Sequence, residues 1–193
     1  MKLLLAAAKA AGAVTLALGV AAAAHAQANV LVNGSFETGL ASWTTSGFTL
    51  QGYNYGTDSA AQSGASAFYG GAVGGLGFLS QSFASIAGQQ YGIDLWLASD
   101  GFLPNRFQVV ANGQVLLDLE DVLLQPYRAV HTAFTATGSL TQLQFGFRND
   151  SGSLHLDSVT VTAIPEPTTV ILLALGLGGL AIRRRQMLSS GAA

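Results

Sequence analysis

Alternation of hydrophobic and polar residues marks the middle of the chain, between Gln27 and Ile164. Every second residue is hydrophobic in three segments, which are Tyr91–Leu97, Val115–Leu119 and Leu143–Phe147. A period of two is typical of strands that bury one face. Clusters of Gly and Asn separate such segments, and no amphipathic helix of useful length interrupts them. The pattern therefore predicts many short strands joined by turns, which is an all-β sandwich.

The pattern predicts individual strands and also specifies two local features. The predicted strands are residues 30–32, 43–50, 66–70, 77–84, 90–98, 105–111, 114–119, 129–136, 141–148 and 154–162. Asn112-Gly113 favours the positive φ angles of a type I′ turn, so it predicts a tight hairpin. The hydrophobic parity changes between Leu156 and Val159, and a β-bulge at Asp157-Ser158 would reconcile the two halves of that strand.

The first 26 residues have the three parts of a secretory signal peptide in the expected order. Lys2 and Lys9 give a positive region, residues 10–24 are small and apolar, and Ala24 and Ala26 occupy the positions that signal peptidase reads. We therefore expect a signal helix over residues 1–26, cleavage after Ala26 and export of the mature chain. The alternative is an uncleaved N-terminal anchor helix.

A rigid acidic turn, an uncharged run and a basic cluster follow the last predicted strand. Pro165, Glu166 and Pro167 lead into residues 168–182, which carry no charge, and the cluster is Arg183, Arg184 and Arg185. A helix over that run would be ~22 Å long, short of the ~30 Å hydrocarbon core of a bilayer. We expect a transmembrane helix held transiently in the inner membrane, with the arginines on the cytoplasmic side.

These signals divide the chain into four expected segments. They are a signal peptide (1–26), a β-sandwich domain (27–163), a sorting signal with its hydrophobic helix and arginine cluster (164–186), and a disordered tail (187–193).

Composition places the packed core in the middle segment and makes that segment acidic. All the aromatic residues lie between Phe36 and Phe147, and aromatic rings supply large buried areas. Residues 27–164 hold three arginines against nine acidic residues, a formal net charge of −6. An acidic domain disfavours nucleic acid as a partner, because phosphates repel it. The chain has no Cys, which excludes disulfides and thiolate chemistry.

Two motifs at the ends of the middle segment resemble a known family of domains. Residues 33–39, Asn-Gly-Ser-Phe-Glu-Thr-Gly, with Trp43 shortly after, resemble the opening of galactose-binding-like jelly-roll domains and related carbohydrate-binding modules. Residues 156–161 are similar to their closing strand, and residues 74–81 and 145–150 resemble the version carried by exported proteins with a Pro-Glu-Pro tail. The resemblance implies a jelly-roll β-sandwich.

The same resemblance implies a structural Ca²⁺ where the first and last strands meet. Glu37 and Asp157 match the carboxylate ligands of that family, and backbone carbonyls would complete the shell of oxygens. The family pattern has two adjacent Asp in the closing strand, whereas this chain has Ser158 at the second position. The alternative is that Glu37 caps a turn and Asp157 is a surface acid. No other cofactor is expected.

The C-terminal constellation closely resembles the PEP-CTERM sorting signal of Gram-negative bacteria. That resemblance rests on Pro165-Glu166-Pro167, the hydrophobic run and Arg183–Arg185, in this order near the end of the chain. It implies recognition by an exosortase, a membrane cysteine peptidase that cleaves near the motif, and an association with exopolysaccharide production. A plain single-pass anchor is the alternative, and only the sorting signal predicts cleavage.

Four polar or aromatic residues opposite the aliphatic faces are candidates for sugar binding. They are Asp94, Trp96, Gln144 and Arg148. Apolar sugar faces stack on aromatic rings, and hydroxyls need both donors and acceptors. The alternative is an ordinary solvated sheet face with Trp96 under a loop. Tyr53, Tyr55 and Tyr69 are further candidates for a site at the loop end of the sandwich.

Catalysis has little support, so we expect a protein that is not an enzyme. Asp118, Glu120 and Asp121 are clustered, but a glycosidase needs carboxylates on both sides of its substrate. His131 and His155 are single histidines on β segments, and the chain has no G-x-S-x-G, H-E-x-x-H or P-loop pattern. We expect an exported protein of the cell surface or extracellular matrix that binds exopolysaccharide. The alternatives are a structural surface protein without a ligand and, less favoured, a glycoside hydrolase.

Overall fold

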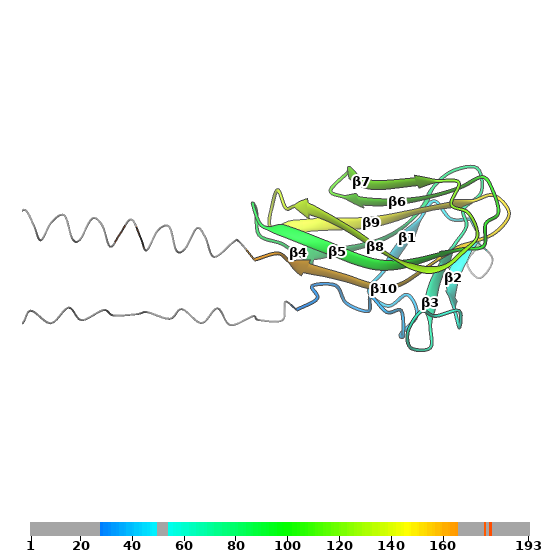
Figure 1. Cartoon of the computed structure of the whole chain (residues 1–193), viewed down its shortest axis with the longest axis horizontal. Helices are drawn as coiled ribbons and strands as arrows, with labels where there is room; N and C mark the ends of the chain where they lie inside the picture. Colours follow the sequence, from blue (N-terminus) through cyan, green and yellow to red (C-terminus); the bar gives the residue numbers. More distant parts are fainter. Residues whose placement is uncertain (1–27, 50–53, 166–175, 177, 179–193) are drawn as a thin grey trace, which may run out of the picture.

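Two five-stranded antiparallel sheets pack face to face in the computed structural model, which describes residues 28–49, 54–165, 176 and 178 (Figure 1). Sheet A contains, in spatial order, β1 (Thr44–Ser46), β4 (Gly77–Ala84), β9 (Leu140–Asn149), β6 (Asn105–Ala111) and β7 (Gln114–Glu120). Sheet B contains β2 (Tyr55–Asp58), β3 (Ala67–Gly70), β10 (Leu154–Ala163), β5 (Gln90–Ser99) and β8 (Gln125–Thr135). The predicted all-β jelly-roll sandwich is confirmed.

Nine of the ten predicted strands are present, and the differences have local causes. The first predicted strand, residues 30–32, is wrong: the Asn29 side chain accepts the Val161 N–H at 2.8 Å, where a strand would offer a carbonyl. The second strand is shorter than predicted because Gly47 turns the chain with a φ of 75°. The edge strand β8 begins earlier than predicted and passes through Pro126, which an edge strand tolerates.

The sequence prediction missed β2. This strand has only four residues, Tyr-Gly-Thr-Asp, which is too short to show a clear alternation. It pairs with β3 at the margin of sheet B, so tertiary context creates it.

The core between the sheets is rich in aromatic rings. Phe68 and Phe147 lie with ring centroids 5.0 Å apart, and Phe107 stacks on Phe145 at 6.2 Å. All four side chains are fully buried. The interior faces of β5 and β9 therefore match the alternation in the sequence.

The predicted hairpin and bulge are both confirmed. Asn112 and Gly113 have φ angles of 47° and 80°, and they join β6 to β7 as a two-residue turn. In β10 the register with β5 shifts between Asp157 and Thr160, and Ser158 has a φ of 52°. The bulge turns the Asp157 side chain into a fully buried position.

The sandwich has two different ends, which we name by their connections. The tail end carries the turns at 85–89, 112–113 and 136–139, together with the chain leaving β10 at Ile164 (Figure 1). The loop end carries residues 71–76, 100–104, 121–124 and 150–153 (Figure 1). Strands β5 and β10 run the full distance between the two ends.

Several predicted features lie outside the described residues. These are Ala24 and Ala26 of the signal peptide, Glu166 and Pro167 of the sorting motif, the arginines 183–185, and both terminal helices apart from Gly176 and Gly178, which are helical. Within the part of the chain that the structure describes, no helix has the length and hydropathy needed to cross a bilayer.

Candidate functional site

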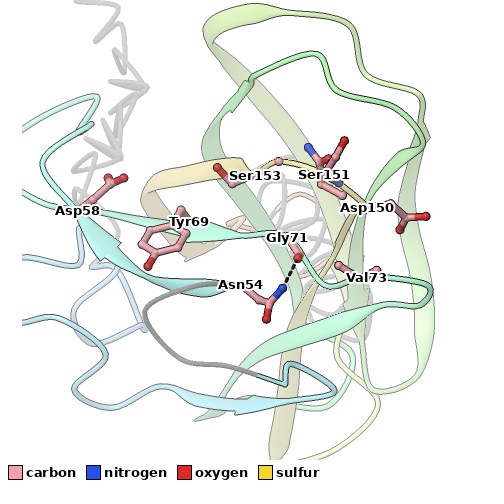
Figure 2. Close-up of a pocket in the computed structure, with 10 residues that line it drawn as sticks. Asn54, Asp58, Tyr69, Gly71, Val73, Asp150, Ser151 and Ser153 are labelled. Carbon is pink, nitrogen blue, oxygen red and sulfur yellow. Dashed lines mark hydrogen bonds between the residues drawn. The ribbon is translucent and has the colours of Figure 1, made fainter.

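A cavity of about 420 Å³ opens at the loop end of the sandwich (Figure 2). Its walls come from β2 and β3 with the start of the following loop, and from the turn between β9 and β10. The lining residues are Asn54, Asp58, Tyr69, Gly71, Val73 and residues 149–153. This volume lies in the range of pockets that hold small ligands.

The turn at residues 149–153 forms one wall, and Asp100 holds it in place. The Asp100 carboxylate accepts the Ser153 N–H at 2.5 Å and the Asn149 side-chain N–H at 2.9 Å. A Cβ at Gly152 would collide with this carboxylate, and a Cβ at Gly71 would collide with the Gly152 carbonyl oxygen. Two glycines therefore allow the two walls to approach each other closely.

Asn54 fixes the opposite wall. Its side chain donates to the Gly71 carbonyl at 3.3 Å, the bond drawn in Figure 2, and accepts from the Thr49 hydroxyl at 3.0 Å. The Asn54 carbonyl also accepts the Gly71 N–H at 2.7 Å. Because these bonds use both ends of its amide, Asn54 shapes the cavity more than it offers groups to a ligand.

The groups open to the cavity combine carboxylates, hydroxyls and one aromatic ring. Tyr69 lies between Asp58 and Gly71 in Figure 2, and Ser153 stands near them. Burial, followed by the charge of Asp58, raises the pKa of the Tyr69 hydroxyl, so this group stays protonated and can donate. Asp58 also contacts the His155 Nε2 at 3.1 Å, which positions its carboxylate.

Asp150 is held in its ionised form at the rim of the cavity. Arg148 donates two hydrogen bonds to it, at 2.8 and 2.6 Å, and the Gly74 N–H donates a third at 3.0 Å. These bonds, with Arg148 the larger cause, lower the pKa of Asp150 to about 2. Asp150 is therefore an acceptor at any ordinary pH.

The four residues predicted for sugar binding lie on opposite sides of the molecule. Asp94 and Trp96 are on the outer face of sheet B, whereas Gln144 and Arg148 are on the outer face of sheet A. Asp94 pairs with His131, and the Gln144 amide lies 3.4 Å from the Ser80 hydroxyl. The two pairs do not form one site, and Arg148 reaches the cavity only through Asp150.

Trp96 lies where a loop crosses the outer face of sheet B. Ala60 of the β2–β3 loop accepts the Tyr127 hydroxyl of β8 at 2.6 Å, and the Gln62 N–H of the same loop reaches Asp157 of β10 at 2.8 Å. β5 lies between β8 and β10, and its Trp96 is paired with Asp157. The half-buried state of Trp96 fits a ring next to this loop.

The proposed calcium ligands anchor that same loop through backbone N–H groups. Asp157 accepts from Gln62 and Ser63 at 2.8 and 3.0 Å, and Glu37 accepts from Ala65 and Ser66 at 3.0 and 3.1 Å. A calcium ion needs six to eight oxygen ligands. Among residues 28–49 and 54–165, no three His, Cys, Asp or Glu side chains are grouped as a metal site. The two carboxylates are turned toward N–H donors, so their arrangement does not support the calcium site that the family resemblance implies, and that site stays untested.

The acidic cluster considered for hydrolysis is occupied by ion pairs. Arg106 binds Asp118 through two nitrogens and lies 3.3 Å from Glu120. Hydrogen bonds from Arg106 and, to a smaller extent, Gln108 lower the pKa of Asp118. A general acid needs a pKa near the working pH, so Asp118 is poorly suited to that role. Asp94, the acidic residue among the sugar-binding candidates, lies on the other sheet and cannot join this cluster.

Sequence reasoning found Tyr69 as a loop-end candidate but missed its partners. Tyr55 is instead half-buried against Phe48, with ring centroids 4.7 Å apart, and Tyr53 lies outside the described residues. The segment Asn149-Asp150-Ser151-Gly152 consists of residues that favour turns. Its distance in sequence from Asp58 and Tyr69 hid the fact that all of them face one cavity.

Comparison with solved structures shows where this fold occurs. The domain is similar to a carbohydrate-binding module, TmCBM61, solved with β-1,4-galactotriose, with a TM-score of 0.58 and 16% identity over 72% of this chain and all of that chain. It is similar to the CBM22-1 xylan-binding domain of Paenibacillus barcinonensis Xyn10C, with a TM-score of 0.56 and 17% identity over 75% of this chain and all of that chain. It is also similar to the K1 cleaved adhesin domain of Lys-gingipain from Porphyromonas gingivalis W83, with a TM-score of 0.53 and 16% identity over 68% and 96% of the two chains.

Comparison of sequences gives one further match. No curated protein matches the chain. Residues 163–185 match the model of the PEP-CTERM protein-sorting motif, which indicates export with membrane-anchored sorting and implies processing by an exosortase. Strand β10 ends at Ala163, where the segment that matches the PEP-CTERM sorting motif begins, and the sandwich before it has the jelly-roll fold that carbohydrate-binding modules share.

Proposed function

We propose that this protein is delivered to the cell surface or extracellular matrix, where its sandwich binds a neutral polysaccharide without cleaving it. The observation that carries the proposal is the cavity in which Tyr69 lies beside Asp58 and near the Asp150 rim. The cavity is at the loop end, and the sorting motif begins at the tail end. A domain held by its tail would therefore present the cavity away from the membrane.

The chemistry of the cavity suits a sugar. A sugar ring can stack its apolar face on the Tyr69 ring. Its hydroxyls can donate to the Asp58 and Asp150 carboxylates, and bonds to ionised acceptors are about twice as strong as neutral ones. Ser151 and Ser153 add hydroxyls that both donate and accept.

The charge of the cavity favours neutral sugars over acidic ones. Two carboxylates face the ligand, and the domain as a whole carries three arginines against nine acids. The nearest arginine to the cavity, Arg148, is already engaged by Asp150. A uronic acid would meet repulsion without an unengaged cation in the described lining, so we expect neutral chains to bind better.

The ionised state of Asp150 supports binding without cleavage. Glycoside hydrolysis needs one carboxylic acid that gives up a proton to the leaving oxygen. Asp150, with a pKa of about 2, cannot hold that proton near neutral pH. The cavity therefore offers acceptors for hydroxyl groups and a poor proton donor.

The test is affinity electrophoresis of the purified full-length protein in detergent, in gels that contain galactan, xylan, polygalacturonate or the exopolysaccharide of the producing cells. We expect retardation by a neutral chain and at least a tenfold loss of affinity in Tyr69→Ala. Tyr69→Phe is the matched control and should retain most of the affinity, because it keeps the ring. Trp96→Ala should bind like the wild type, because Trp96 is not among the residues that line the cavity.

Three results would contradict the proposal. They are stronger binding to polygalacturonate than to neutral chains, affinity that Tyr69→Ala leaves unchanged, and release of reducing sugar from a bound chain. A folded protein that binds none of the polysaccharides would favour the structural alternative.

A further inference from the structure

The sorting motif begins inside the folded domain. The motif match starts at Ala163, which is the last residue of β10. The next residue is still bonded to the sheet, because the Ile164 N–H donates to the Gln90 carbonyl at 2.8 Å. Pro165 has no N–H, so the ladder cannot continue past Ile164. No spacer separates the domain from the Pro-Glu-Pro segment.

One side chain holds this junction. The Gln89 amide donates to the Ile164 carbonyl at 2.6 Å and to the neighbouring Gln90 carbonyl at 2.9 Å. We call this pair of bonds the Gln89 clasp. Together with the ladder bond, it engages both the N–H and the carbonyl of Ile164.

Gln89, which forms the clasp, lies in a turn that backbone hydrogen bonds hold in place. The Gln89 N–H donates to the Ile86 carbonyl at 3.0 Å, and the Gln89 carbonyl accepts the Ala136 N–H at 2.9 Å. On the other side, the Ile164 side chain lies over Gly92, where a Cβ would sit 3.7 Å from the Ile164 Cδ1. The junction is therefore fixed by backbone, by side-chain and by apolar contacts.

We propose that the Gln89 clasp is a restraint on the sorting peptidase. A peptidase that takes its substrate as an extended strand must bond to the main chain near the cut. Here the N–H and the carbonyl of Ile164 are both hydrogen-bonded within the domain. The enzyme can therefore bind only the main chain that follows Ile164, unless the clasp opens. The cut leaves Ile164 on the domain: one peptide bond breaks, its carbonyl carbon gains the hydroxyl group of a water molecule, and the amine of the tail gains the remaining proton. Gln89 is a positioning residue that slows this step.

This inference rests on exosortase processing, and its test separates the two ideas. The full-length protein would be expressed in exosortase-bearing cells and followed by pulse-chase, with the mature C-terminus read by mass spectrometry. Gln89→Ala is expected to speed processing roughly two- to tenfold, the range of one net hydrogen bond. Gln89→Lys is expected to keep the slow rate, because its ammonium group can still donate to both carbonyls. Gln90→Ala is the matched control, since its exposed side chain takes no part in the clasp.

Inserting a spacer shows whether faster processing comes from loss of the clasp or from a general loss of stability. A Gly-Ser-Gly-Ser insertion after Ile164 should speed processing, and adding Gln89→Ala should then change nothing. Hydrogen exchange in the uncut protein gives a readout that needs no exosortase: the Ile164 amide should be protected in the wild type and lose protection in Gln89→Ala.

Equal rates in the wild type and Gln89→Ala would overturn the clasp while leaving sorting intact. The same holds for a mature end upstream of Ile164, or for an Ile164 amide that exchanges freely in the wild type. An intact C-terminus at Arg183–Ala193 in every variant would overturn processing itself, and the restraint with it.

Discussion

The two ends of the sandwich depend to different degrees on hydrogen bonds from side chains. At the tail end, backbone groups close the turns: Ser85 donates to Ser139, Gly88 to Ala136 and Ala136 to Gln89, at 2.8 to 3.0 Å. At the loop end, side chains do much of this work, through Asn54, Asp100, Asn105, Asn149 and Asp150. Side chains contribute at the tail end too, through Ser85, Tyr91 and the Gln89 clasp, but the shape of the loop end depends on more of them. These residues fix the loops in the positions that form the walls of the cavity.

The largest expected effect on stability comes from replacing Asp100, the main anchor of the loop end. Asp100→Ala removes the acceptor of three bonds, from Ser153, Asn149 and Phe102, and should lower the free energy of unfolding by about 3 kcal/mol. The measurement is urea denaturation followed by tryptophan fluorescence. Ser139→Ala at the tail end is the control and should change the free energy of unfolding by less than about 0.5 kcal/mol, because only its carbonyl is used. Equal losses in the two variants would remove the distinction between the ends.

A smaller effect is expected where the β2–β3 loop is fastened to the last strand. Asp157→Asn keeps the shape of a fully buried side chain but turns an N–H group toward backbone donors. We expect a loss of about 2 kcal/mol in the free energy of unfolding, measured in the same way. Glu37→Gln should cost less, since Glu37 is exposed to water that can replace the lost bonds. A larger loss for Glu37→Gln would contradict this ranking.

The thermal stability of the protein should depend on pH through Asp150, at the rim of the cavity. Folding lowers the pKa of Asp150 from 3.8 to about 2, so its ionised form stabilises the fold above pH 4, and this contribution disappears as the pH falls through 2. Thermal melts of the wild type should therefore lose Tm between pH 4 and 2. Asp150→Asn should start with a lower Tm at pH 5 and fall less over the same interval. Parallel curves for the two proteins would show that Asp150 is not bonded in this way.

The smallest expected effect concerns calcium. Since the Glu37 and Asp157 carboxylates already accept N–H bonds, neither EDTA nor millimolar CaCl₂ should shift the Tm by more than about 1 °C. MgCl₂ at the same ionic strength is the control. A rise in Tm that is specific to calcium would show that the loop at residues 59–66 rearranges to supply oxygens.

Strand alternation predicted most of the fold but only part of the site. The period of two along β5 and β9 correctly assigned each residue to an inward or an outward face. It could not say which of the two outer faces a residue would occupy, so Trp96 and Arg148 looked compatible with one site although they lie on different sheets. The bulge at Ser158 was predictable because parity changed, whereas β2 was too short to show any period.

The cavity depended on contacts that no local pattern records. The turn at residues 149–152 carries turn-forming residues, and Tyr69 stands in a hydrophobic segment. Their meeting depends on Asp100, which is far from both in sequence, and on glycines that permit close approach. The sorting motif was predicted in full because its recognition is a property of contiguous sequence, which folding does not need to assemble.

The position of β10 has a consequence for the timing of folding. It is the last strand in the sequence, yet it lies in the centre of sheet B and pairs with both β3 and β5. A chain that crosses the membrane N-terminus first delivers this strand only when the sorting motif has reached the membrane. Until then β3 and β5 have no common partner, so sheet B is incomplete. The final pairing and the arrival of the motif then coincide, and an exosortase would meet a substrate only moments after it has become a finished domain.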